Sequence, residues 1–335
     1  MPSALVPQMT LLAAARHELW RHLPAWMFFI YGQLLHNAVL TNFEPPKTEL
    51  AYTVIFPMSV FVLYQVVRFI HGDASRRLLL VSLALATVLP TLTYFVHTPS
   101  PLERDTLLRI YEWSNFVWAA LLMFNLWWQH RSHLLLFFGV AFLYGMVLEN
   151  GGILLGFFHE TNLTETMVKP FVAPFATMVG WSVVLTMATF VVWELRLRLP
   201  WLRRSALSSG VLVGVFATFL DLQIDPIATG IGCWVWHESL PGWFHGVPLV
   251  NFIAWLCALV PFGYVMFRLQ DIRGITDRAP WGRRDLVSLL AWSPAGLVLA
   301  AVAFIAATLI IEGSDGASWT LLKVFSHQLL IATLG

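Results

Sequence analysis

The chain has 335 residues, of which 58% are hydrophobic and only 12% are charged, and its mean hydropathy is +0.71. Soluble domains carry roughly 25% charged residues, so this composition cannot cover a surface that faces water. The formal net charge of +1 argues against a nucleic-acid partner, which needs a basic surface. The two cysteines, Cys233 and Cys257, form no CxxC pair and suggest neither a disulfide framework nor a thiolate metal site.

Apolar segments long enough to cross a bilayer, which takes roughly 20 helical residues, recur along the chain. They are residues 22–41, 49–70, 77–97, 107–128, 133–158, 170–194, 205–222, 248–268 and 286–311. A tenth segment, 318–335, is short and contains Lys323 and His327. Helix breakers such as EPPK, HTPSP and RAPWGRR lie between segments. The sequence therefore predicts an all-α, polytopic transmembrane helical bundle of nine or ten spans, without a soluble domain or a cleavable signal peptide.

The basic residues predict how this bundle is oriented. Alternate loops on one side hold 15 of the 20 Lys and Arg residues, and the other side holds only Lys47, Arg104, Arg109 and Lys169 outside the uncertain last segment. Lys and Arg accumulate in cytoplasmic loops. We therefore expect a multi-pass protein of the cell inner membrane of a bacterium, with a cytoplasmic N-terminus.

With this orientation, the polar residues of several spans lie at one depth. Glu149 lies about 16 residues along its outward-running span, or roughly 24 Å into a core of roughly 30 Å. Asp221 and Asp225 end another outward-running span, and Asn251 begins the next inward-running one. Four further polar residues lie near outer span ends: His36, Asn37, Glu112 and Asn115. Carboxyl groups in a membrane cost several kcal/mol unless they are paired, protonated or hydrated, so we expect a functional site facing the outer leaflet and the periplasm.

Structural explanations for these residues remain open. Polar residues near a span end can cap a helix or extend to the interface, and Asp225 before Pro226 can be a turn residue. Tryptophans can form an interfacial belt, and Gly151, Gly152 and Gly156 can serve only close helix packing.

Metal binding has weak support in the sequence. No HxxHH pair is present, although His130 and His133 are three apart, and His237 and His245 together with Asp225 offer zinc ligands. We predict neither a metal nor a cofactor.

The stretch DLQIDPIATGIGCWVW and the following GVPLVNFIAWL resemble the membrane carotenoid-biosynthesis family that includes the carotenoid 1,2-hydratases and the related bacterioruberin hydratases. That family carries a D-x-x-x-D-P-x-A element, a W-x-W element and a G-V-P-L-x-N-F element that opens the next helix. An upstream glutamate helix followed by glycines and phenylalanines is similar to LENGGILLGFF, which includes Glu149. The residues that match one by one are Asp221, Asp225, Pro226, Trp234, Trp236, Gly246, Pro248, Asn251 and Phe252.

The resemblance covers mainly residues 135–270. It implies a family core at 133–270, preceded by an extension of N-terminal transmembrane helices at 1–132 and followed by C-terminal helices at 271–335. The chain departs from the family after the glutamate helix, where GFFHETNLTE replaces a run similar to P-F-G-x-Y-x-Y.

The activity that the resemblance implies is the addition of water to the terminal C=C double bond of a long isoprenoid or carotenoid, a hydratase reaction of the lyase class. Removing a carboxyl group from water raises its pKa, so that it can stay protonated near neutral pH as a general acid. We expect Asp221, Asp225 and Glu149 to be catalytic. The expected substrate-binding residues are Trp234, Trp236, His237, His245, Asn251 and Trp255, in which indoles face a carbocation and Asn251 and His245 hold the water.

In a second interpretation the chain has the same fold but catalyses no reaction. The chain would then be a non-catalytic membrane subunit that binds carotenoid, membrane lipid or a partner membrane protein through its N-terminal helices. The GFFHETNLTE departure favours this interpretation, and the intact acidic block favours the enzyme.

Overall fold

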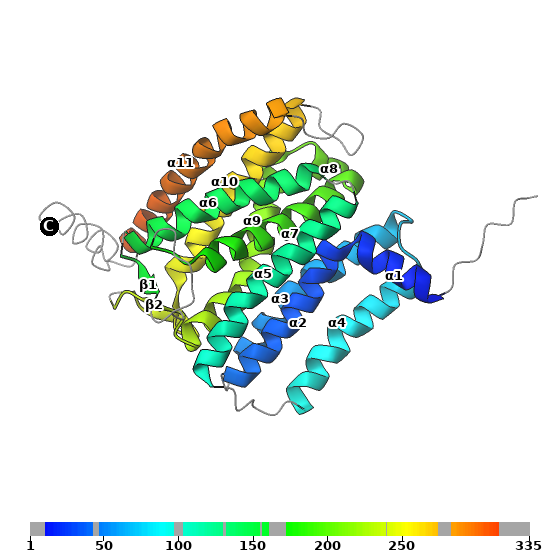
Figure 1. The fold of residues 1–335 in the computed structure, drawn as a ribbon, viewed down its shortest axis with the longest axis horizontal. Coiled ribbons are helices and arrows are strands. Elements are labelled where there is room, and N and C mark those ends of the chain that lie inside the picture. Colours follow the sequence, from blue (N-terminus) through cyan, green and yellow to red (C-terminus); the bar gives the residue numbers. More distant parts are fainter. Residues whose placement is uncertain are drawn as a thin grey trace, which may run out of the picture.

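The computed structural model describes residues 11–42, 47–96, 103–129, 132–154, 156–160, 172–238, 240–273 and 283–314. Long helices form a bundle, and short strands lie at one end of it (Figure 1). The helices are α1 (Leu11–Arg21), α2 (Leu23–Asn42), α3 (Lys47–Ile70), α4 (Arg76–Val96), α5 (Arg104–Trp128), α6 (Ser132–Leu154), α7 (Phe175–Arg198), α8 (Pro200–Arg203), α9 (Ala206–Gly230), α10 (Leu249–Arg273) and α11 (Arg283–Ser314). The strands are β1 (Phe158–Glu160), β2 (Trp234–Trp236), β3 (Gly242–Phe244) and β4 (Val247–Pro248), paired β1–β2 and β3–β4.

The all-α fold that the sequence predicts is confirmed. Each of the nine predicted segments corresponds to one long helix, from α2 to α11 without the short α8. Five of the described helices are long and apolar enough to cross a membrane over their printed stretches: Arg76–Val96, Phe175–Arg198, Ala206–Gly230, Leu249–Ile272 and Leu290–Ala307. The tenth predicted segment lies outside the described residues.

Helix α7 lies in the middle of the bundle. It contacts α2, α3, α5, α6 and α9, and nearly all of its residues from Ala176 to Arg196 are buried. A helix that is apolar on all sides is stable only where protein or lipid surrounds it. By contrast, α4 and α11 lie at opposite edges of the bundle (Figure 1) and leave large apolar side chains exposed along their length, as expected of helices that face lipid.

Glycines allow α9 and α10 to pack with their backbones in contact. A Cβ atom on Gly210 would lie 2.6 Å from the backbone nitrogen of Tyr264, and one on Gly263 would lie 2.9 Å from the Cα atom of Gly210. Small residues at a helix crossing permit this approach in membranes. The antiparallel pair that carries the acidic block is therefore held at a short interaxial distance.

Helix α9 is longer than the sequence predicts. The apolar segment was expected to end at residue 222, but the helix continues through Pro226 to Gly230. It ends in a Schellman motif: Gly232 has a φ of +68°, its N–H donates to Thr229 O, and the N–H of Cys233 donates to Ala228 O. The glycine, not the proline, ends the helix, and both aspartates lie within it.

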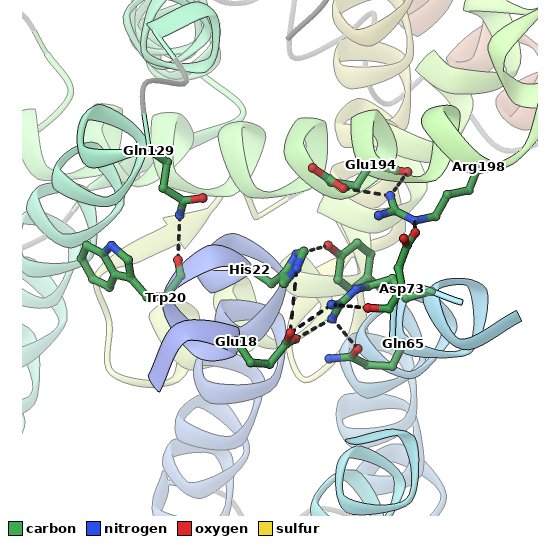
Figure 2. Close-up of polar contacts among 10 residues, drawn as sticks. Glu18, Trp20, His22, Gln65, Asp73, Gln129, Glu194 and Arg198 are labelled. Atoms are coloured by element: carbon green, nitrogen blue, oxygen red, sulfur yellow. Dashed lines mark hydrogen bonds and ion pairs between the residues drawn. The ribbon is translucent and has the colours of Figure 1, made fainter. Parts of the chain in front are cut away.

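Ion pairs lie among the N-terminal helices and between them and α7 (Figure 2), and α1 lies at the end of the bundle away from β1 and β2 (Figure 1). Glu18 of α1 pairs with Arg68 of α3 at 2.5 Å. Asp73, in the turn before α4, pairs with Arg198 of α7 at 2.6 Å, and Arg198 also bonds Glu194 at 2.8 Å. The Glu18–Arg68 pair joins α1 to α3, and the Asp73–Arg198 pair joins the α3–α4 turn to α7, so the N-terminal helices form part of the same bundle.

Candidate active site

A cavity of about 370 Å³ lies where α2, α5, α6, α7, α9, α10 and α11 meet the β1–β2 sheet. Its lining is mostly apolar, and the polar side chains in it include Glu149, Asp225 and Asn251. Small-molecule sites have this form: they are roughly 300–1,000 Å³ in volume and apolar, with a few placed polar groups. The cavity therefore has the size and lining of a binding site for part of an apolar molecule.

Two carboxyl groups of α9 share one hydrogen-bond donor beside this cavity. Asp221 and Asp225 are one helical turn apart, with 0% and 4% of their surface exposed. Asn251, in the first turn of the antiparallel α10, donates from Nδ2 to Asp221 Oδ2 at 3.1 Å and also to Asp225 Oδ2. Asp225 lines the cavity and Asp221 lies behind it, where its Oδ1 has no hydrogen-bond partner among the described residues.

Glu149 reaches the same cavity from α6 and is 7% exposed. Its Oε2 accepts a hydrogen bond from Trp181 Nε1 at 2.8 Å, and the Trp181 ring stacks on Trp255 with centroids 4.4 Å apart. Gly145 makes room for this arrangement, because a Cβ atom there would lie 2.4 Å from Trp181 Cβ. A carboxyl group and two stacked indoles thus form one wall.

The W-x-W element forms strand β2, which explains its spacing. Alternate residues of a strand point to the same face, so Trp234 and Trp236 both line the cavity, while Val235 between them is 41% exposed. Phe158 of β1 pairs with Trp236, and their rings are 5.3 Å apart. The Trp236 indole is oriented by its hydrogen bond to Thr229 Oγ1 at 3.1 Å. The β1–β2 sheet therefore closes one end of the cavity with aromatic rings.

Most of the predicted site residues converge on this cavity. Glu149, Asp225, Trp234, Trp236, Asn251 and Trp255 line it, and Asp221 is joined to it through Asn251. His237 and His245 do not line it. His237 donates its backbone N–H to Phe157 O at 2.9 Å beside β2, and His245 occupies the β3–β4 turn with a φ of +46°.

The outer polar residues of the N-terminal half divide into two groups. Asn115 of α5 lines the cavity, with its side-chain oxygen packed against Gly180 of α7. His36 and Asn37 of α2 instead bond the carbonyl of Pro90 and the side chain of Gln33, away from the cavity.

Several lining residues lie outside the set that the sequence suggests. Tyr31, Tyr111 and Trp181 line the cavity from α2, α5 and α7, and Phe304 lines it from α11. Each is an aromatic residue within an apolar helix, and nothing in the sequence separates it from ordinary core residues. Only the packing of helices that are distant in the chain identifies them.

Within the ranges that the structure describes, no group of three His, Cys, Asp or Glu side chains lies close enough to hold a metal ion. His130 and the side chain of His133 lie outside the described part. The residues present at the cavity therefore offer general acids and bases, aromatic faces and hydroxyl groups.

A model of the family described as carotenoid biosynthesis protein matches residues 112–320, which begin within α5 and end beyond α11. The chain belongs to the carotenoid biosynthesis protein family. The match contains both aspartates, Glu149, Asn251 and the W-x-W strand, and α1 to α4 precede it. No match is found among curated proteins or among solved structures.

Proposed function

We propose that this member of the carotenoid biosynthesis family is a hydratase that adds water to a terminal double bond of a long isoprenoid. The observation that carries the proposal is the buried pair of carboxyl groups, Asp221 and Asp225, bridged by Asn251 at the wall of an apolar cavity. The reaction converts an alkene and one water molecule into a tertiary alcohol and needs no other reactant.

Buried carboxyl groups favour catalysis over simple binding. A cavity that only holds a hydrocarbon chain has no use for Glu149, Asp221 and Asp225, and removing carboxylates from water costs several kcal/mol each. Two carboxylates beside one amide nitrogen also repel each other, and a single proton held by the pair removes this repulsion. Such a proton is the reagent that hydration of an alkene needs first.

The steps follow from which groups face the cavity. Asp225 gives its proton to the CH carbon of the double bond, and the neighbouring carbon becomes a tertiary cation. Trp255 and Trp234 line the cavity, and an indole stabilises a nearby cation by roughly 0.5–2 kcal/mol per ring. Water forms the new C–O bond and loses its extra proton to a carboxylate. The candidate for this base is Glu149, which lines the cavity from α6, whereas Asp225 lines it from α9.

The placement in the membrane is part of the same proposal. We infer nine or ten spans, a cytoplasmic N-terminus in a bacterial inner membrane, and a cavity that opens toward the outer leaflet. The last turn of α7 carries two ion-paired arginines, Arg196 and Arg198, whereas its first turns line the cavity. Because Lys and Arg accumulate on the cytoplasmic side, this arrangement supports a cavity on the outer side. The tryptophans around the cavity suit the outer interface.

The test is expression of the chain in a lycopene-producing host, followed by analysis of the extracted pigments by mass. A product heavier by one water supports the hydratase. Unchanged lycopene that copurifies with the protein in a fixed ratio would identify the alternative, a non-catalytic carotenoid-binding subunit. An unchanged pigment profile together with pigment-free protein would contradict both interpretations for this substrate.

A further inference from the structure

Two tyrosines of the cavity have hydroxyl groups without an assigned partner. Tyr31 of α2 is 7% exposed, and Tyr111 lies in α5. Both line the cavity, and among the described residues no hydrogen bond to either hydroxyl is found. Two other tyrosines in the bundle differ: Tyr64 Oη bonds His22 Nδ1 at 2.7 Å, and Tyr144 Oη donates to Ala258 O at 2.6 Å. Buried tyrosine hydroxyls normally find a partner, so the two at the cavity have a hydrogen bond to offer a ligand.

Aromatic neighbours hold both rings in place. The Tyr31 ring makes an edge contact with Trp118, with centroids 5.5 Å apart, and the Tyr111 ring makes one with Trp234 at 6.2 Å. Both tyrosines line the same cavity as Asp225 and Glu149. Their edge contacts with Trp118 and Trp234 limit how far the two rings can move.

Asn251 is poorly suited to hold the water, although the sequence makes it a candidate. Its amide nitrogen has two hydrogens, and the structure gives that nitrogen two acceptors, Asp221 Oδ2 and Asp225 Oδ2. His245, the other candidate, does not line the cavity. The attacking water thus needs other donors and acceptors, and a tyrosine hydroxyl supplies one of each.

We propose that Tyr31 and Tyr111 bind the oxygen atom of the water that is added to the double bond. The inference rests on the proposed function and names two positioning residues for it. The water accepts a hydrogen bond from one tyrosine and donates one to the other, which leaves a lone pair for the cationic carbon. When the C–O bond forms, the oxonium group loses one proton to a carboxylate, so that proton count and charge balance.

Tyr31 gives the N-terminal helices a role at the site. It belongs to α2, which lies before the part of the chain that matches the family. Helix α2 also packs against α7 and α9, the helices of Trp181 and Asp225. The extension therefore contributes a wall of the reaction chamber in addition to any surface for a partner protein.

The test compares Tyr31→Phe and Tyr111→Phe with Tyr144→Phe, whose hydroxyl lies outside the site. Each substitution keeps the ring and its aromatic contacts, and membranes are matched for the amount of protein. The reaction is run in D₂O with lycopene, and both the alcohol and the recovered alkene are analysed for deuterium. A cation that water does not capture loses a proton, so the recovered alkene gains deuterium.

We expect each site variant to form alcohol about tenfold more slowly, the effect of losing one hydrogen bond. The ratio of deuterated alkene to alcohol should rise in both variants and stay at the wild-type value in Tyr144→Phe. A merely structural role would lower both products together and leave their ratio unchanged, and that outcome, or wild-type alcohol formation, would overturn the inference. If the wild-type protein forms neither alcohol nor deuterated alkene, the proposed function fails first.

Discussion

A single amide group determines how two carboxyl groups lie together inside the bundle. Asn251 donates to both Asp221 and Asp225 from one nitrogen atom, and only Asp225 faces the cavity. The two aspartates therefore have different surroundings although they occupy adjacent turns of one helix. Carboxyl groups in different surroundings can take different roles in acid–base catalysis.

We expect Asp225→Asn to abolish hydration while the protein remains folded and inserted. Asn keeps the size of Asp but cannot give up a carboxyl proton, and losing a general acid costs about 10²–10⁴ in rate. Trp236→Phe is the milder control, because a phenyl ring keeps part of its attraction for a cation. The assay is product formation in membranes with matched amounts of each variant. Full activity in both Asp225→Asn and Asp221→Asn would show that the aspartates are structural.

The polar and indole residues that the sequence singles out lie at or beside the cavity, whereas His237 and His245 do not line it. The spacing of Trp234 and Trp236 is local, so a strand places both rings on one side. The positions of His237 and His245 depend on the β1–β2 pairing and on the β3–β4 turn, which join segments that a sequence pattern does not relate. For the same reason the sequence did not identify Tyr31, Tyr111 and Trp181 as cavity residues, because their neighbours at the cavity belong to other helices.

Among the elements, α9 shows how a local rule can be overridden. Proline removes a backbone donor and usually ends or bends a helix, yet α9 continues for four residues beyond Pro226 and eight beyond the predicted end at residue 222. Burial of α9 against α7 and α10 maintains the helix through Pro226, and the Schellman motif at Gly232 then ends it. The first four predicted segments agree with α2, α3, α4 and α5 to within three residues at each end, because long apolar runs have no competing structure in a membrane.

The close contact of α9 and α10 predicts a strong effect for one substitution. In Gly210→Ala the new Cβ atom would lie 2.6 Å from Tyr264 N and 2.7 Å from Val260 O, which are backbone atoms that cannot turn away. Overpacking of this kind costs about 1–3 kcal/mol of stability. Thermal unfolding of the detergent-purified protein should therefore begin at a lower temperature.

The matched control is Gly139→Ala in α6, where no atom lies within 4 Å of the new Cβ. Alanine favours a helix over glycine by about 1 kcal/mol, so this variant should unfold at the wild-type temperature or above it. Equal unfolding temperatures for Gly210→Ala and the wild type would mean that α9 and α10 are farther apart than described here.

For the whole molecule, the N-terminal helices and the family core form one bundle. Ion pairs from Glu18 to Arg68 and from Asp73 to Arg198 link α1, α3 and the α3–α4 turn to α7, and Tyr31 reaches the cavity. The division at residues 132 and 270 that the resemblance implies remains a prediction about ancestry. The order of the helices along the chain could be predicted from hydropathy, but their lateral arrangement could not, because each has several apolar faces.

The proposed orientation can be tested by labelling single cysteines in intact spheroplasts. A cysteine at Glu238, exposed beyond β2, should react with a membrane-impermeant maleimide, because we place this end of the bundle in the periplasm. A cysteine at Ser75, exposed at the opposite end, should react only after the membrane is permeabilised. The unsubstituted chain reports background from Cys233 and Cys257. The reverse pattern would contradict a cytoplasmic N-terminus.

The hydrogen bond that bridges the carboxyl pair also sets an order of events during synthesis. Asn251 lies 30 positions after Asp221, so the ribosome, adding roughly 5–20 residues per second, makes it roughly 2–6 s later. Throughout that interval α9 exists without the donor that joins its two acids. Until α10 has been made, the two carboxyl groups of α9 therefore lack the hydrogen-bond donor that joins them in the folded bundle.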